Sequence, residues 1–291
     1  MEQLSFWPQP TEGLKIVNPA TVSHLSPFRY PGGKTWFVPY MRQWLLSLPQ
    51  RPRLFVEPFA GGAIVSLTVA SEKLADRVLF VELDEQVASV WRTILSDDAE
   101  WLCRQILSFD LTPQNADGAL SRPPRSVREM AFQTILRNRI NHGGILAPGA
   151  GRIKKGEKGK GIRSRWYPKT LCKRIRYIHD VLSTRLTFVH GDGMAVVEQY
   201  KEQSDVVFFV DPPYTTPGKS AGTRLYTHHT LDHERLFDLM SEVKGHFLMT
   251  YENSEYVRRL ADKHGFIYRP IAMKNTHHAK MTELLISTHF G

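Results

Sequence analysis

Short apolar runs alternate with segments of helical spacing along most of this chain. The predicted strands are 53–57, 77–82, 186–190, 206–210, 246–251, 266–272 and 283–289. Helical spacing covers 63–73, 85–95, 100–107, 194–202, 232–243 and 254–264. This alternation is typical of a doubly wound, mainly parallel sheet with helices on both faces. We therefore predict an α/β fold of the Rossmann-like type.

One basic segment interrupts the alternation. Residues 122–176 hold 16 Lys and Arg against two acidic residues, a charge of +14, whereas the rest of the chain carries −5 and the whole chain +9. Predicted helices at 127–140 and 168–182 flank a glycine-rich stretch, and Trp166 and Tyr167 interleave with the charges. This favours a surface that binds a polyanion over a solvated loop. We expect an extended arm at 1–25, an α/β domain formed by 26–110 and 186–291, and an inserted, mostly helical domain at 111–185.

The tetrapeptide Asp211-Pro212-Pro213-Tyr214 directly follows the apolar strand 206–210. Ligands of open α/β sheets bind at this carboxyl edge. The prolines lack an N–H and fix φ, so nearby carbonyls are held in place and stay available as acceptors. A carboxylate, an oriented carbonyl and an aromatic face can together hold an exocyclic amino group on a flat heterocycle. This chemistry suits methylation of a nucleobase amine.

Paired glycines, Gly61 and Gly62, follow the strand 53–57 and lead into a helix, so a ligand can approach the backbone there. Glu82 ends the next strand, where an acidic side chain suits ribose hydroxyls. Both features fit a cofactor that contains a nucleoside, without saying which one. The stretch Gly33-Lys34-Thr35 imitates the end of a P-loop, but Phe28 stands where that motif requires glycine, which excludes an NTPase of that type.

Three motifs in this order resemble the Dam-type, alpha-group adenine-N6 DNA methyltransferases. They are Arg29-Tyr30-Pro31-Gly32-Gly33-Lys34, Glu57-Pro58-Phe59-Ala60-Gly61-Gly62 and Asp211-Pro212-Pro213-Tyr214. In that family the target-recognition domain lies between the cofactor loop and the catalytic tetrapeptide, as the basic segment does here. The likeness spans roughly 26–290. Two departures are Glu82, where the family usually has aspartate, and Ala63, where a third glycine is common.

The resemblance implies S-adenosylmethionine as cofactor and double-stranded DNA as partner. It assigns catalysis to Asp211, Pro212, Pro213 and Tyr214. It assigns the cofactor to Tyr30, Lys34, Phe59, Gly61, Gly62, Glu82, Asp192 and Asp211, although Asp192 equally fits a turn after a strand. We expect DNA contacts from Arg137, Asn138, Arg139, Asn141, Lys154, Lys155, Lys158, Lys160, Arg163 and Arg165.

The expected reaction is therefore methyl transfer to adenine N6 in a short DNA sequence, by base flipping and direct in-line attack. The residues leave open cytosine N4 methylation, RNA methylation and a non-catalytic DNA-binding subunit. They also leave open the oligomeric state and a restriction or defence partner. Cys103 and Cys172 lie in no metal-like spacing, and the histidine groups 228–233 and 277–278 lack matching ligands, so we expect no metal. No signal peptide or membrane span is predicted, and a cytoplasmic location is expected.

Overall fold

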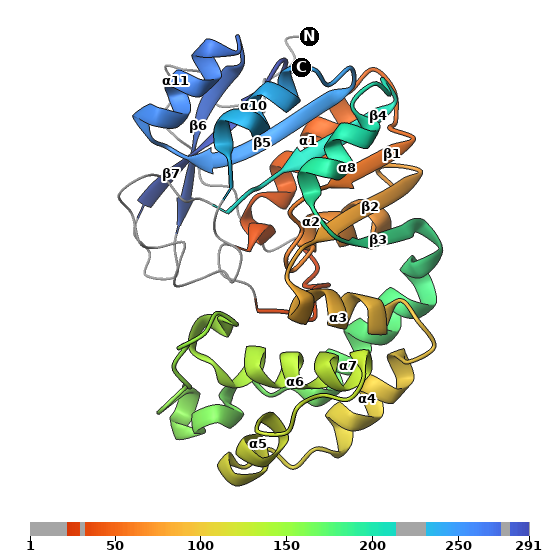
Figure 1. Cartoon of the computed structure of the whole chain (residues 1–291), viewed down its shortest axis with the longest axis vertical. Coiled ribbons are helices and arrows are strands. Elements are labelled where there is room, and N and C mark those ends of the chain that lie inside the picture. The colour runs from red at the N-terminus through yellow and green to blue at the C-terminus, as the bar shows by residue number, and fades with distance from the viewer. Residues whose placement is uncertain (1–21, 30–32, 214–230, 275–279, 291) are drawn as a thin grey trace.

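A seven-stranded mixed sheet forms the centre of the computed structural model, which describes residues 22–29, 33–213, 231–274 and 280–290 (Figure 1). The strand order is β3-β2-β1-β4-β5-β7-β6. The strands are β1 (Leu54–Glu57), β2 (Arg77–Glu82), β3 (Leu186–His190), β4 (Val206–Val210), β5 (His246–Glu252), β6 (Ile267–Lys274) and β7 (Lys280–Ser287).

Strands β1 to β5 pair in parallel, and only β7 runs antiparallel to its neighbours β5 and β6. The expectation of a mainly parallel Rossmann-like sheet is thus confirmed. The order changes direction between β1 and β4, and this switch point is where open α/β sheets bind ligands. The last strand begins at Lys280, ahead of the expected start at 283.

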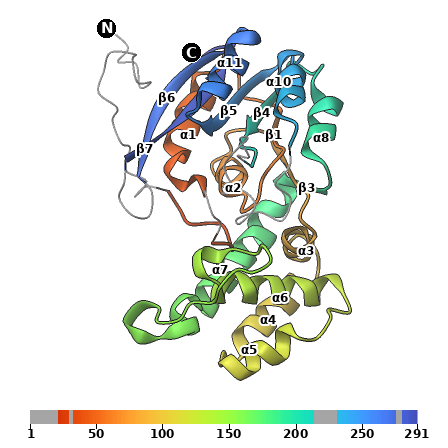
Figure 2. The same cartoon turned by 60° about the vertical axis from the view of Figure 1, so that its left-hand side comes forward.

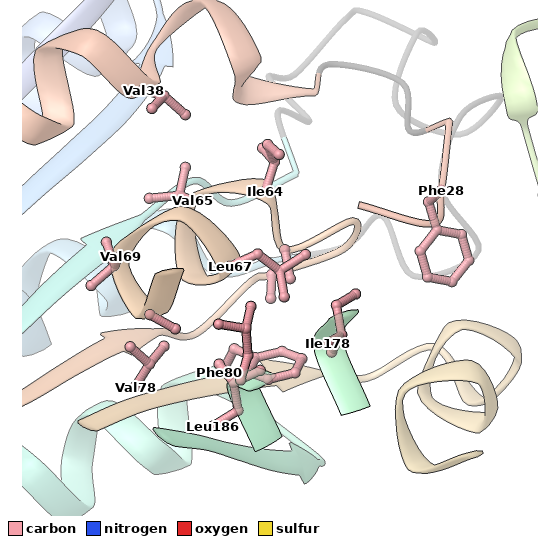
Figure 3. Close-up of a cluster of buried hydrophobic side chains, with 14 of the residues drawn as sticks. Phe28, Val38, Ile64, Val65, Leu67, Val69, Val78, Phe80, Ile178 and Leu186 are labelled. Atoms are coloured by element: carbon pink, nitrogen blue, oxygen red, sulfur yellow. The ribbon is translucent and has the colours of Figure 1, made fainter. Parts of the chain in front are cut away.

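Two hydrophobic cores cover the two faces of the sheet, because alternate residues of each strand point to opposite sides. On one face Phe55, Phe80 and Phe209 pack with α1 (Val38–Ser47), α2 (Ile64–Ser71) and α3 (Glu85–Ile94). Side chains of α2, β2 and β3 meet in this core (Figure 3). On the other face Val56 and Phe208 pack with α8 (Gly193–Tyr200), α10 (His233–Ser241) and α11 (Glu255–Lys263). Burial on both sides explains why the central strands β1 and β4 are almost wholly apolar.

A second, helical layer lies beyond α3 (Figures 1 and 2). It contains α4 (Ala99–Ser108), α5 (Pro113–Leu120), α6 (Val127–Ile140) and α7 (Pro168–Tyr177). Leu102 and Ile106 of α4 share a core with Leu171 and Ile175 of α7. Because α4 packs with this layer, we propose that the insertion begins near residue 99 and not at 111.

Local sequence signals explain most helix starts. The side chains of Asp84, Ser126, Asp192, Asp232 and Ser254 accept hydrogen bonds from the first-turn amides of α3, α6, α8, α10 and α11. Proline stands in the first turn of α1, α5 and α7. In the described part of the chain, no helix has the length and apolar character needed to cross a membrane.

Candidate active site

Asp211 lies directly beyond β4, at the carboxyl edge of the sheet. The hydroxyl of Thr250, on the neighbouring strand β5, donates to Asp211 Oδ1 at 2.7 Å. Strand register explains the contact: Val210 pairs with Met249, so the next residue on each strand comes level. The following Pro212 is buried. The carboxylate is therefore held in a defined orientation by the sheet itself.

Lys34 brings the N-terminal motif to the same carboxylate. Its Nζ lies 3.1 Å from Asp211 Oδ1 and 3.0 Å from Glu283 Oε2, and the side chain is 5% exposed. Burial alone lowers the pKa of Lys34, but the two carboxylates outweigh it and hold the pKa above its ordinary value. Burial, opposed by Lys34 and reinforced by Asp211, raises the pKa of Glu283. Glu283 was absent from the sequence-based site.

Glu57 is a second buried carboxyl group beside Asp211. It ends β1, and its Oε2 accepts the Ser66 backbone N–H at 2.9 Å and the Ser66 hydroxyl. Burial raises the pKa of Glu57 to about 8, against the Ser66 hydrogen bonds and with a further contribution from Asp211. The sequence pointed to Glu57, because an acidic residue at the end of a buried strand lies at the carboxyl edge of the sheet, where ligands bind.

The loop between β1 and α2 brings its backbone close to the sheet edge. Gly61 has φ of 48°, and its carbonyl accepts the Trp91 indole N–H at 3.0 Å. Ala63, at the N-cap of α2, also has a left-handed conformation with φ of 49°. That conformation explains why glycine is common there in the resembling family, and the structure accommodates alanine. Phe59 is half-buried against the core of the α8 face.

Glu82 ends β2 next to this loop. Its Oε1 accepts the Asp84 backbone N–H at 2.8 Å. Burial raises the pKa of Glu82 to about 7, while hydrogen bonds from the backbone of Asp84, Leu83 and Gly61 oppose the rise. The structure thus brings together the glycine loop and the acidic side chain that the sequence had paired.

Asp192 follows β3 and caps α8, accepting the Met194 N–H at 2.9 Å. The next residue, Gly193, is so close to the glycine loop that an added Cβ would lie 2.1 Å from the Pro58 carbonyl oxygen. Asp192 therefore has the structural role that was expected of a turn residue after a strand. Because Asp192 lies beside the β1–α2 loop, a contact between its side chain and the cofactor stays a proposal.

Three of the residues expected to contact DNA are buried in this structure. Asn138 is fully covered, and its amide bonds the backbone of Arg29 and the carbonyl of Gly144. Arg139 is 4% exposed and donates to the Pro27 carbonyl. The amide of Asn141 donates to the Ile145 carbonyl at 2.8 Å. In this structure these three side chains hold the protein backbone, and contacts between them and DNA stay a prediction.

The other basic candidates divide into two groups. Arg137 reaches Gln86 Oε1 at 3.0 Å, Arg163 donates to the Leu111 carbonyl at 2.5 Å, and Arg165 pairs with Glu157. Arg137 thus bonds α3 outside the insertion, whereas Arg163 and Arg165 bond groups within it. The remaining members are all exposed within residues 154–160 and are Lys154, Lys155, Lys158 and Lys160.

Two aromatic candidates, Tyr30 and Tyr214, lie outside the described residues, as do the neighbouring histidines 228–229 and 277–278. Among the residues that the structure describes, no group of three or more His, Cys, Asp or Glu side chains is arranged to hold a metal ion.

Comparison with known proteins gives one family match. Residues 144–276 match the model of the D12 class N6 adenine-specific DNA methyltransferases. No curated protein sequence matches the chain. Among solved structures, it resembles the rRNA methyltransferase aviRa from Streptomyces viridochromogenes, at 10% identity, TM-score 0.41 and coverage of 94% of both chains. It also resembles the SAM-dependent methyltransferase from Agrobacterium tumefaciens, at 9% identity and TM-score 0.42, with coverage of 87% of this chain and 61% of that chain. Residues 144–276 thus match the D12 class of N6 adenine-specific DNA methyltransferases, which agrees with the family that the three sequence motifs resemble.

Proposed function

We propose that this protein transfers a methyl group from S-adenosylmethionine to adenine N6 in double-stranded DNA. The observation that carries the proposal is the Asp211 carboxylate, oriented by Thr250 and Lys34 at the switch point of the sheet. An oriented acceptor at that edge suits an exocyclic amine, and the match to the adenine-specific class supports adenine as the base.

The residues around the β1–α2 loop fit the proposed cofactor. The left-handed Gly61 lets a ligand approach the backbone without a side chain in the way. Glu82 adds carboxylate oxygens beside that backbone, where a ribose can donate its hydroxyls. We assign the cofactor to these two residues with Lys34, Phe59, Gly62 and Asp192. When bound, S-adenosylmethionine supplies an activated methyl group on a positively charged sulfur.

Asp211 and the Pro212 carbonyl act on the amine. The lone pair of an adenine amino nitrogen is delocalised into the ring, which makes it a weak nucleophile. If these two oxygens accept the two amine hydrogens, the nitrogen moves towards tetrahedral geometry and regains lone-pair density. Orientation of this kind can lower a barrier by about 7–11 kcal/mol, so the proposal needs no covalent intermediate. The proton lost by the amine leaves through Asp211 or solvent.

The proposal requires the adenine to leave the duplex, at a cost of a few kcal/mol, because the stacked base cannot reach Asp211. The basic insertion supports binding to the DNA backbone. Lys154, Lys155, Lys158 and Lys160 are exposed and can neutralise phosphates. These contacts favour any DNA sequence, so recognition of a particular site rests on other groups.

The test is transfer of labelled methyl groups from S-adenosylmethionine to plasmid DNA and, in parallel, to structured RNA. Each product is digested to nucleosides and separated. Label in N6-methyl-2′-deoxyadenosine from the DNA, and none in the RNA, supports the proposal. Label in N4-methylcytosine or only in RNA would replace it with the corresponding reaction, and no label from a protein that binds DNA would indicate a non-catalytic subunit.

A further inference from the structure

The ammonium group of Lys34 is shared by two carboxylates in a largely buried site. Nζ lies 3.1 Å from Asp211 and 3.0 Å from Glu283, and the three side chains are 5%, 20% and 11% exposed. With both carboxylates ionised, the group carries a net charge of −1. Without Glu283, the remaining pair would be neutral.

Glu283 occupies an unusual place for a charge. It lies on β7 next to Leu284, Leu285 and Ile286, all of which are fully buried. Its register partner on β5 is Glu252. A charge buried in such a strand is weak evidence for stability, since well-packed apolar residues often serve at least as well. The geometry therefore points to a role in the chemistry of the site.

The proposed reaction explains what that role is. A cation paired with Asp211 alone would withdraw electron density from the carboxylate that must accept the amine hydrogen. It would also repel the sulfonium of the cofactor and the positive charge that develops on the amine. A second carboxylate on Lys34 offsets both effects while Lys34 still orients Asp211.

We propose that Glu283 is a positioning residue for methyl transfer, which shares the Lys34 ammonium and keeps Asp211 effective as an acceptor. This inference rests on the function proposed above. Glu283→Gln keeps the size of the side chain and one acceptor oxygen but removes the charge. Lys34 then pairs more fully with Asp211.

The first readout is binding without turnover. S-adenosylmethionine and S-adenosylhomocysteine differ in the methyl group and in the charge on sulfur. Calorimetry on Glu283→Gln should therefore give an unchanged affinity for the neutral thioether and a several-fold loss for the sulfonium. A merely structural role would weaken both ligands alike. Equal losses for the two ligands, or no loss for either, overturn the proposal.

The second readout is the single-turnover rate on DNA with both ligands saturating. Loss of a charge-assisted interaction predicts a rate about 10- to 100-fold below that of wild type. The matched control Glu252→Gln removes a charge from the register partner and should stay within about threefold. A Glu283→Gln rate equal to that of the control would contradict the proposal.

Folding is checked by circular dichroism and thermal unfolding. If Glu283→Gln does not fold, Glu283→Asp keeps the charge and is measured instead. It should retain the ligand preference of wild type, and loss of that preference would overturn the proposal. Assays of wild type in parallel separate the proposed function of the protein from the proposed role of Glu283. An inactive wild type refutes the proposed function, whereas an active wild type with an equally active Glu283→Gln refutes only the role of Glu283.

Discussion

The side chain of Asn138 forms hydrogen bonds with both the N–H and the carbonyl of Arg29, as the backbone of a neighbouring strand would. Its Oδ1 accepts the Arg29 N–H at 2.9 Å, and its Nδ2 donates to the Arg29 carbonyl at 2.8 Å. Nearby, Arg174 donates to the Ser26 carbonyl at 2.9 Å. Helices α6 and α7 of the insertion thus hold the start of the segment that carries Lys34 to Asp211.

Replacing Asn138 by alanine should therefore destabilise the protein. The buried backbone groups of Arg29 lose their partners, which costs about 1–3 kcal/mol each where they stay unsatisfied. Denaturant unfolding measures this loss, with Asn115→Ala as the control, since Asn115 is exposed and donates to a single carbonyl. The methylated sequence should stay the same. A changed target sequence with full stability would restore Asn138 as a DNA-reading residue.

Glu57 should make stability fall as pH rises. Its folded pKa of about 8 lies above the ordinary value of 4.5, so the native state holds more protons than the unfolded state between about pH 4.5 and 8. The contribution is fully present below pH 4.5 and is lost as pH rises towards 8. In Glu57→Gln this part of the slope should disappear. The free energy of unfolding of wild type and of Glu57→Gln, measured from pH 5 to 8, tests this. If both free energies change with pH in parallel, Glu57 does not have the raised pKa.

Gly61 should be specifically required for cofactor binding. Valine at a φ of 48° is strained and also places a side chain where we propose that the loop backbone meets the cofactor. Gly149→Val is the matched control, because Gly149 has φ of 82° and open space around its Cβ position. Calorimetry should give loss of S-adenosylmethionine binding for Gly61→Val and normal binding for Gly149→Val once both are shown to be folded. Normal binding by both would place the cofactor elsewhere.

The four exposed lysines should govern the salt dependence of DNA binding. Changing Lys154, Lys155, Lys158 and Lys160 to glutamine should reduce the slope of log affinity against log salt by up to about 0.9 for each phosphate that is no longer neutralised. The control changes Lys244 and Lys263, which are exposed and lie just after α10 and at the end of α11, outside the basic insertion. An unchanged slope in the four-lysine variant would assign DNA binding to another surface.

The strands and the helix starts were predictable because they depend on local patterns, such as the apolar run at 206–210 and the Asp84 and Ser254 caps. Helix α1 was missed, although its Pro39 marks a helix start. The burial of Asn138 and Arg139 could not be read from α6, because it depends on carbonyls more than 100 residues earlier in the chain. Glu283 was hidden for the same reason: its partner Lys34 is 249 residues away.

In the proposed reaction, the Asp211 carboxylate accepts the amine hydrogen during transfer to adenine N6. Asp211→Asn keeps the size of the side chain and removes the charge. The most direct measurement is the single-turnover rate of N6-methyladenine formation at saturating cofactor and DNA. We predict a rate at least about 10²- to 10³-fold below that of wild type, with both ligands still bound. A rate within tenfold of wild type would contradict the account.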